Sequence, residues 1–138
     1  MQKFICRNLF LKFGDKKVVI RHKSFDHKGG WYHYRIHALK MSDLCKGILL
    51  PLRKYLEDIF EQCPNDYFQI GPRSSALKFQ LDRLDLKHVT NHDLCDWTKL
   101  GLEKYSEKYN TPHSQVQMFM LENDNKTIAT EVPLWLEP

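Results

Sequence analysis

The sequence predicts an α+β fold in which a mainly antiparallel sheet carries two helices packed on one face. Three observations lead to this prediction. Most apolar residues alternate at strand spacing, in short runs separated by polar turns. Residues 44–60 and 94–105 instead repeat their apolar residues at helical spacing. The predicted order is βββ-α-ββ-α-ββ, and a chain of 138 residues forms a single domain, residues 1–138.

The first two predicted strands form a hairpin. Residues 3–13 form the first strand, a turn follows at residues 14–16, and residues 18–22 return as the second strand. Residues 24–30 contain Phe25 as their only large apolar side chain and end in two glycines. This composition predicts a loop between the hairpin and the third strand.

The third predicted strand, residues 31–40, has two different faces, because successive side chains on a strand point to opposite sides. One face is apolar enough to lie against a core and carries Tyr32, Tyr34, Ile36 and Ala38. The other face is a row of basic and aromatic groups, Trp31, His33, Arg35, His37 and Leu39. Unpaired polar groups are costly to bury, so we expect Arg35 to point outward.

The first helix follows this strand, with Ser42 as its expected N-cap. Pro51 is incompatible with an uninterrupted helix, because proline removes a hydrogen bond and clashes with the preceding turn. Proline suits a first helical position, so we expect a break at residues 47–50 and a main helix that begins at Pro51. This helix ends at residues 63–66. Its apolar stripe predicts three buried side chains near its C-terminal end, Leu56, Ile59 and Phe60.

The second half of the chain predicts two more hairpins around a second helix. Residues 67–70 and 76–81 read as one strand pair, and residues 116–121 and 126–132 as the other. Between them, a helix begins near residues 90–93 and ends at residues 110–112. We expect its apolar stripe to bury Trp97.

Several sequence features argue against a membrane or secreted protein. No apolar run approaches the roughly 20 residues that a membrane span requires, and Lys3, Arg7 and Lys12 interrupt the apolar segment that a signal peptide needs. The four cysteines are widely spaced and include no C-x-x-C pair, which favours reduced thiols over disulfides. We therefore expect a cytoplasmic protein that does not associate with membranes.

Charge is distributed unevenly along the chain. Residues 1–56 hold thirteen Lys and Arg against three acidic residues, a balance of +10, and residues 57–138 hold eight against fourteen, a balance of −6. These balances agree with the formal net charge of +4. The asymmetry predicts a basic patch on the N-terminal part of the sheet that attracts acidic partners, unless the acidic half neutralises it in the fold.

Three sequence patterns are candidates for chemistry. His33 and His37 flank Arg35, as in sites that cleave phosphodiesters, but residues four apart on a strand lie about 13 Å apart. A catalytic pair therefore needs another histidine, such as His22 or His27. His88, His92 and Cys95 have a spacing similar to that of zinc ligands but lack a fourth ligand. The turn around Arg73 offers donors to an anion.

The leading hypothesis is a non-enzymatic interaction module that docks an acidic partner protein, as an inhibitor, immunity-type protein or adaptor does. Its predicted binding residues are Arg21, Lys23, Trp31, His33, Arg35, His37 and Arg73. One alternative is a nucleic-acid-binding protein that uses the same face, with Trp31 stacking on bases. A second is a small metal-independent phosphodiesterase or nuclease. We expect no catalytic residues under the leading hypothesis, and no cofactor or metal under any of the three.

Overall fold

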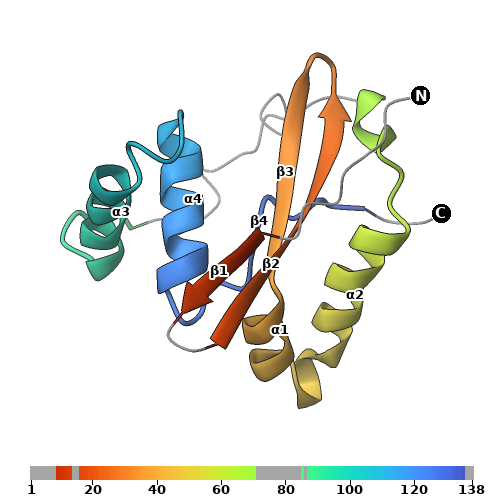
Figure 1. Cartoon of the computed structure of the whole chain (residues 1–138), viewed down its shortest axis with the longest axis horizontal. Coiled ribbons are helices and arrows are strands. Elements are labelled where there is room, and N and C mark those ends of the chain that lie inside the picture. Colours follow the sequence, from red (N-terminus) through yellow and green to blue (C-terminus); the bar gives the residue numbers. More distant parts are fainter. Residues whose placement is uncertain (1–8, 14–15, 71–84, 86, 136–138) are drawn as a thin grey trace.

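The computed structural model describes residues 9–13, 16–70, 85 and 87–135 of the chain (Figure 1). The strands in these ranges are β1 (Leu9–Phe13), β2 (Lys16–His27), β3 (Gly30–His37) and β4 (Ala129–Thr130). The helices are α1 (Ala38–Leu44), α2 (Leu50–Glu61), α3 (Asp93–Lys104) and α4 (Pro112–Asn123), with short 3-10 helices η1 (Gly47–Leu49) and η2 (Tyr67–Gln69). The chain is therefore an α+β protein.

The strands form one antiparallel sheet in the order β1-β2-β3-β4. Strand β2 is the long central element and pairs with β3 over its whole second half. In this register His22 lies opposite Arg35, and Ser24 lies opposite His33. Residues directly opposite each other on paired strands point to the same face of the sheet, so these four side chains share one face.

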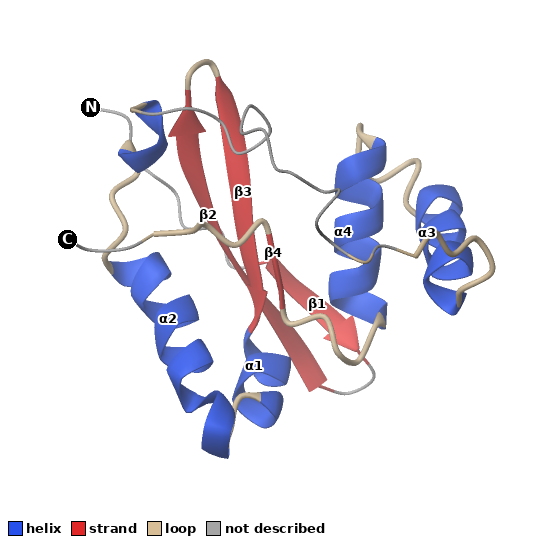
Figure 2. Ribbon diagram, turned by 180° about the vertical axis from the view of Figure 1, so that it is seen from behind, coloured by secondary structure: helices blue, strands red, loops and turns tan. Residues whose placement is uncertain are grey.

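Helices α1 and α2 cover the opposite face (Figures 1 and 2). The main core lies there and contains Phe25, Tyr34, Ile36, Met41, Cys45, Leu56, Ile59, Phe60, Cys63 and Trp135. The hydroxyl of Tyr34 donates a hydrogen bond of 2.9 Å to the carbonyl of Leu56, which ties β3 to α2. The predicted burial of the α2 stripe, Leu56, Ile59 and Phe60, is confirmed.

Helices α3 and α4 lie on the other side of the sheet (Figures 1 and 2). Ile20 of β2 packs there in a second core with Tyr105, Met118, Phe119 and Leu121. A Cβ atom on Gly101 of α3 would lie 3.1 Å from three side-chain atoms of Phe119, so glycine permits the close approach of α3 to α4. The prediction of helices on one face is therefore wrong, because the sheet carries an apolar patch on each side.

The predicted C-terminal hairpin is also wrong. Residues 112–123 form helix α4, which begins with Thr111 as N-cap and Pro112 in its first turn. Apolar residues at 116, 118 and 120 imitate a strand, but burial of Met118, Phe119 and Leu121 follows the helix. Only Ala129 and Thr130 of the predicted final strand pair with β3.

Two local boundaries also differ from the predictions. Strand β2 continues through the predicted loop to His27, because Phe25 is buried in the main core and the reversal occurs at Lys28 and Gly29, which have φ of 40° and 88°. Strand β3 ends at His37, whose Nδ1 accepts from the backbone N–H of Lys40 and caps α1. Ser42, the predicted cap, lies inside α1.

The predicted break before Pro51 is confirmed, since η1 separates α1 from α2 and Pro51 lies in the first turn of α2. The predicted strand at residues 67–70 is instead η2, and its predicted partner at residues 76–81 lies outside the described residues. Trp97 is 37% exposed, against the prediction of burial. In the described part of the chain, no helix has the length and apolar character needed to span a membrane.

Candidate functional site

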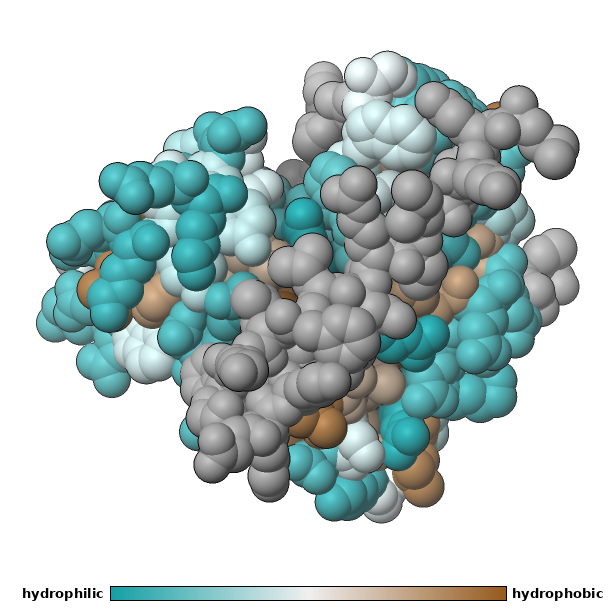
Figure 3. Space-filling model, viewed as in Figure 1, coloured by the Kyte–Doolittle hydropathy of each residue, from teal (hydrophilic) through white to brown (hydrophobic). Residues whose placement is uncertain are grey.

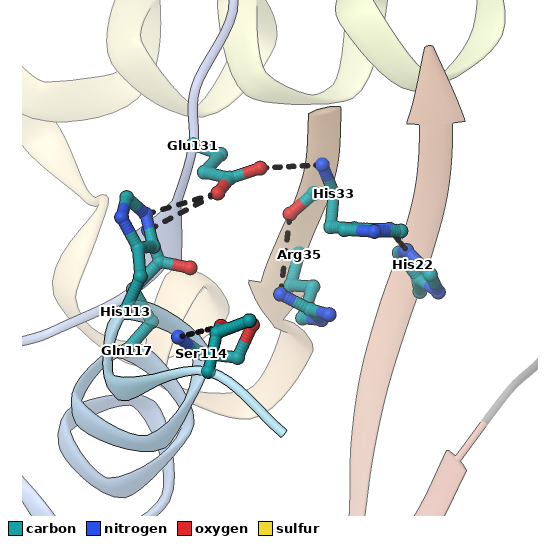
Figure 4. A network of polar contacts seen from close by, with 8 residues as sticks. His22, His33, Arg35, His113, Ser114, Gln117 and Glu131 are labelled. Atoms are coloured by element: carbon teal, nitrogen blue, oxygen red, sulfur yellow. Dashed lines mark hydrogen bonds and ion pairs between the residues drawn. The ribbon is translucent and has the colours of Figure 1, made fainter. Parts of the chain in front are cut away.

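Polar side chains from the second half of β2, the middle of β3, the first half of α4 and the residue after β4 lie together (Figure 4). We call this group the histidine–arginine cluster, and it consists of His22, Ser24, His33, Arg35, His113, Gln117 and Glu131. Two segments far apart in the sequence contribute to it, since His33 and Glu131 are 98 residues apart.

The two halves of α4 have different roles, and together they position the cluster. Its second half carries the apolar residues Met118, Phe119 and Leu121, which pack with Ile20. Its first half carries His113 and Gln117, which reach the polar part of the same sheet face. The sheet face therefore changes from apolar to polar along β2, and α4 follows the same change.

The two histidines of the sheet are in direct contact. The Nε2 atom of His22 lies 3.1 Å from the Nδ1 atom of His33, and the hydroxyl oxygen of Ser24 lies 3.3 Å and 3.4 Å from these two nitrogens. Burial, with the charges of Arg35 and His33, lowers the pKa of His22 from 6.5 to about 4. Burial and the charge of Arg35 also lower the pKa of His33. Both imidazoles are therefore predominantly neutral at pH 7.

Glu131 binds the cluster together from the other side. One carboxylate oxygen accepts from the backbone N–H of His33, and the other lies 3.3 Å from the Gln117 Nε2 and 3.1 Å from the His113 Nε2. The backbone of Glu131 has φ of 49°, a left-handed conformation that residues other than glycine rarely adopt. Such conformations persist where surrounding contacts hold them, and these three contacts do so here.

Arg35 lies at the centre of the cluster and is half-buried. Its only hydrogen bond among the described residues is a long one, 3.5 Å from Nη1 to the carbonyl of His33. Within the described ranges no carboxylate lies at ion-pair distance from its guanidinium. Burial lowers the pKa of Arg35, while Glu131 and Tyr109 oppose this shift. An arginine remains charged in proteins and has five N–H donors. The cluster therefore contains a cation whose donors can bind a further acceptor.

Two of the predicted binding residues lie on the opposite face of the sheet. The Nζ of Lys23 donates to the carbonyls of Ile59, Phe60 and Cys63 at 3.1, 3.0 and 2.7 Å. The guanidinium carbon of Arg21 lies 4.4 Å from the centre of the Phe60 ring. These two cations therefore contact the C-terminal part of α2, and the predicted basic residues do not form one continuous surface.

The remaining predicted residues are also divided. His33 and Arg35 belong to the cluster, and His37 is buried as the cap of α1. Trp31 follows the β2–β3 turn, on the strand face that carries His33, and is 54% exposed. Arg73 lies outside the described residues.

The sequence reasoning missed His113, Gln117 and Glu131. It interpreted residues 116–121 as a strand and thereby placed Gln117 in the wrong element. The charge asymmetry favours candidates in the basic half, whereas Glu131 lies in the acidic half. His22, one of the two expected partners of His33, does lie beside it.

The zinc-like spacing of His88, His92 and Cys95 does not bring these side chains together as metal ligands. Among the described residues, no three His, Cys, Asp or Glu side chains are arranged to hold a metal ion. The Nδ1 atom of His92 accepts a hydrogen bond of 3.1 Å from the N–H of Leu94, and His92 caps α3.

The cluster brings one guanidinium and two imidazoles together. These groups can donate hydrogen bonds to a carboxylate or a phosphate. Acid–base cleavage of a phosphodiester requires one group on each side of the reacting atoms, but His22 and His33 contact each other. No protein family, curated protein or solved structure matches the chain.

Proposed function

We propose that the chain is a non-enzymatic interaction module that binds an acidic partner protein by receiving a carboxylate at Arg35. An inhibitor, an immunity-type protein or an adaptor would fit this role. The observation that carries the proposal is the half-buried guanidinium of Arg35, which has no carboxylate at ion-pair distance among the described residues.

The energetics favour an external carboxylate. Partial removal of a cation from water costs free energy, which a nearby anion offsets. The planar guanidinium fork binds a carboxylate through two parallel hydrogen bonds, and such charge-assisted bonds are stronger than neutral ones. Glu131 does not supply them, since no ion pair joins it to Arg35 in the described ranges and its two oxygens contact His33, Gln117 and His113 instead.

The partner's carboxylate also changes the histidines. A negative charge beside an imidazole favours its protonated form, so binding should raise the pKa of His22 or His33. Only one of the two is expected to take up the proton, because their nitrogens lie 3.1 Å apart and like charges repel. The site then presents two positive charges to the acidic side chain.

A capture experiment with matched variants tests the proposal. Immobilised wild type, Arg35→Gln and Lys99→Gln are exposed to lysate of the native host, each with and without nuclease. Lys99 is the control because it is an exposed cation on α3 that pairs with Asp96, outside the histidine–arginine cluster. A protein retained by wild type and Lys99→Gln after nuclease treatment, but lost by Arg35→Gln, supports the proposal. The acidic residues of the captured partner are then replaced one at a time to find the carboxylate that binds Arg35.

Other outcomes contradict the proposal. Equal retention of the partner by Arg35→Gln would show that the docking surface lies elsewhere. As a direct check, the Arg35 Nε–H signal in nitrogen-correlated NMR spectra should shift on addition of a glutamate-rich peptide.

The second candidate function is nucleic-acid binding at the same site. The observation that favours it is Trp31, which is 54% exposed on the strand face that also carries His33 and Arg35. An exposed aromatic ring stacks on bases while arginine binds a phosphate. Loss of all captured material after nuclease treatment, with tight and salt-sensitive binding of a single-stranded oligonucleotide, would favour this function.

A further inference from the structure

A second surface lies at the junction of α1 and α2, away from the histidine–arginine cluster. Five apolar side chains are exposed there within nine residues: Leu44, Ile48, Leu49, Leu50 and Leu52. We call them the junction patch. Ile48 is 94% exposed, and the other four are between 40% and 54% exposed. Figure 3 shows hydrophobic residues at the lower end of the molecule, where Figure 1 places this junction.

The local backbone explains why these side chains project. Gly47 has φ of 55° and lets the chain turn sharply after α1, so that η1 carries Ile48 outward. Pro51 fixes the start of α2 immediately afterwards. The main core takes Met41, Cys45 and Leu56 from the same region and leaves the junction patch uncovered.

The size of the junction patch fits a specific interface. Its exposed fractions correspond to on the order of 500 Å² of surface, as much as the largest apolar patch of a typical monomer. A stable interface of standard size buries about 800 Å² per partner, and in homodimers about two-thirds of that is apolar. The junction patch supplies the apolar share of one such interface.

The charges around the junction patch indicate which partner fits it. Three basic side chains at its rim are paired with three acidic ones: Lys46 with Asp43, Arg53 with Glu57, and Lys54 with Asp58. A surface of anionic lipid or an acidic protein attracts an excess of positive charge. Among the residues that the structure describes, these three pairs leave no such excess at the rim. When the rims of two copies face each other, neither rim brings an excess of positive or negative charge.

A groove adjoins the junction patch. Ile48 projects beside an open, shallow groove lined by Leu50, Pro51, Arg53, Lys54 and Glu57. In a two-fold contact, the same residues of each copy face each other's counterparts. A two-fold axis close to Leu49 would place Ile48 of each copy against the groove of the other. We propose that the junction patch is the interface of a symmetric homodimer of this chain.

Analytical ultracentrifugation over a concentration range up to about 200 µM tests this proposal, with an affinity in the micromolar range expected. The informative variants are Ile48→Asp and Leu50→Asp. Ile70→Asp is the matched control, because Ile70 is also an isoleucine, is 90% exposed and lies outside the junction patch. Circular dichroism establishes that each variant is folded.

The expected result is a wild-type dimer that Ile70→Asp preserves and that Ile48→Asp weakens at least about 100-fold, or roughly 2.7 kcal/mol. A wild type that remains monomeric at about 200 µM overturns the proposal, and so does a dimer that survives both patch variants. Equal loss of the dimer in Ile70→Asp overturns it as nonspecific association. A monomer that cosediments with phosphatidylserine vesicles through Ile48 overturns it in favour of a lipid-binding surface.

Discussion

The imidazole rings of His22 on β2 and His33 on β3 are in contact, with 3.1 Å between the Nε2 atom of His22 and the Nδ1 atom of His33. One nitrogen must donate and the other accept, so a single proton lies between the two rings. A second proton would place two like charges in contact beside the guanidinium of Arg35. The pH dependence of both stability and binding follows from this arrangement.

Stability should decrease as the pH is lowered through the range in which unfolded histidine takes up a proton. The pKa of His22 is about 4 in the fold and 6.5 without it, so between these values the unfolded chain binds the additional proton. The contribution of His22 is complete above about pH 6.5 and is lost as the pH falls toward about 4. Urea unfolding of wild type and His22→Gln at several pH values measures this, and the variant should show a weaker pH dependence. Identical slopes would show that His22 does not titrate as described.

Binding of an acidic partner should strengthen as the pH falls from about 7.5 to about 5.5, because the bound carboxylate favours a protonated imidazole. Calorimetry in buffers of different ionisation enthalpy measures the accompanying proton uptake. In His22→Gln and His33→Gln, both the uptake and the pH dependence should be reduced. Binding that is independent of pH, without proton uptake, would place the carboxylate away from the histidine pair.

Replacements of Arg35 should separate folding from binding. Arg35→Gln should remain folded and weaken partner binding at least tenfold, about 1.4 kcal/mol, with a smaller effect at high salt. Arg35→Glu introduces a second carboxylate near Glu131 into a half-buried position, so it should also lower the free energy of unfolding, by about 1–3 kcal/mol. Chemical unfolding and titration of both variants measure the two effects. A fully stable Arg35→Glu variant would show that Arg35 is a solvated surface residue.

Lys23 should stabilise the fold rather than contribute to binding. Its Nζ atom donates to three carbonyls at the C-terminal part of α2, so Lys23→Met should cost about 1–3 kcal/mol. The control is Lys54→Met, which removes an exposed ion pair with Asp58 and should change stability by about 0.5 kcal/mol or less. Thermal and urea unfolding compare the two variants. A similarly small effect of Lys23→Met would contradict its assignment as a structural contact.

Phe60 should be a major contributor to the main core. Its ring lies 4.9 Å from the ring of Tyr34 and beneath the guanidinium of Arg21, and the residue is buried. Phe60→Ala should lower the free energy of unfolding by about 3–5 kcal/mol. Tyr67→Ala, at a position that is 40% exposed, is the comparison and should cost less. Equal effects in urea unfolding would argue against the packing of α2 on the sheet.

Local sequence patterns determined several elements of the fold. Alternation predicted β3 and its two faces, and helical spacing predicted α2 with Leu56, Ile59 and Phe60 buried. Proline geometry predicted the break before Pro51, and the helix-start signal near residues 90–93 agrees with α3. These features depend on interactions between residues a few positions apart, which a short stretch of sequence contains in full.

The tertiary structure decided the rest. The alternating residues of 116–121 suit a strand or a helix, and packing of Met118, Phe119 and Leu121 with Ile20 and Tyr105 selects the helix. That choice covers the second face of the sheet and changes Arg35 from an expected surface residue to a half-buried one. It also brings His113 and Glu131 to His33 and Arg35. Contacts across 98 residues depend on which layers pack together, and no local periodicity encodes that information.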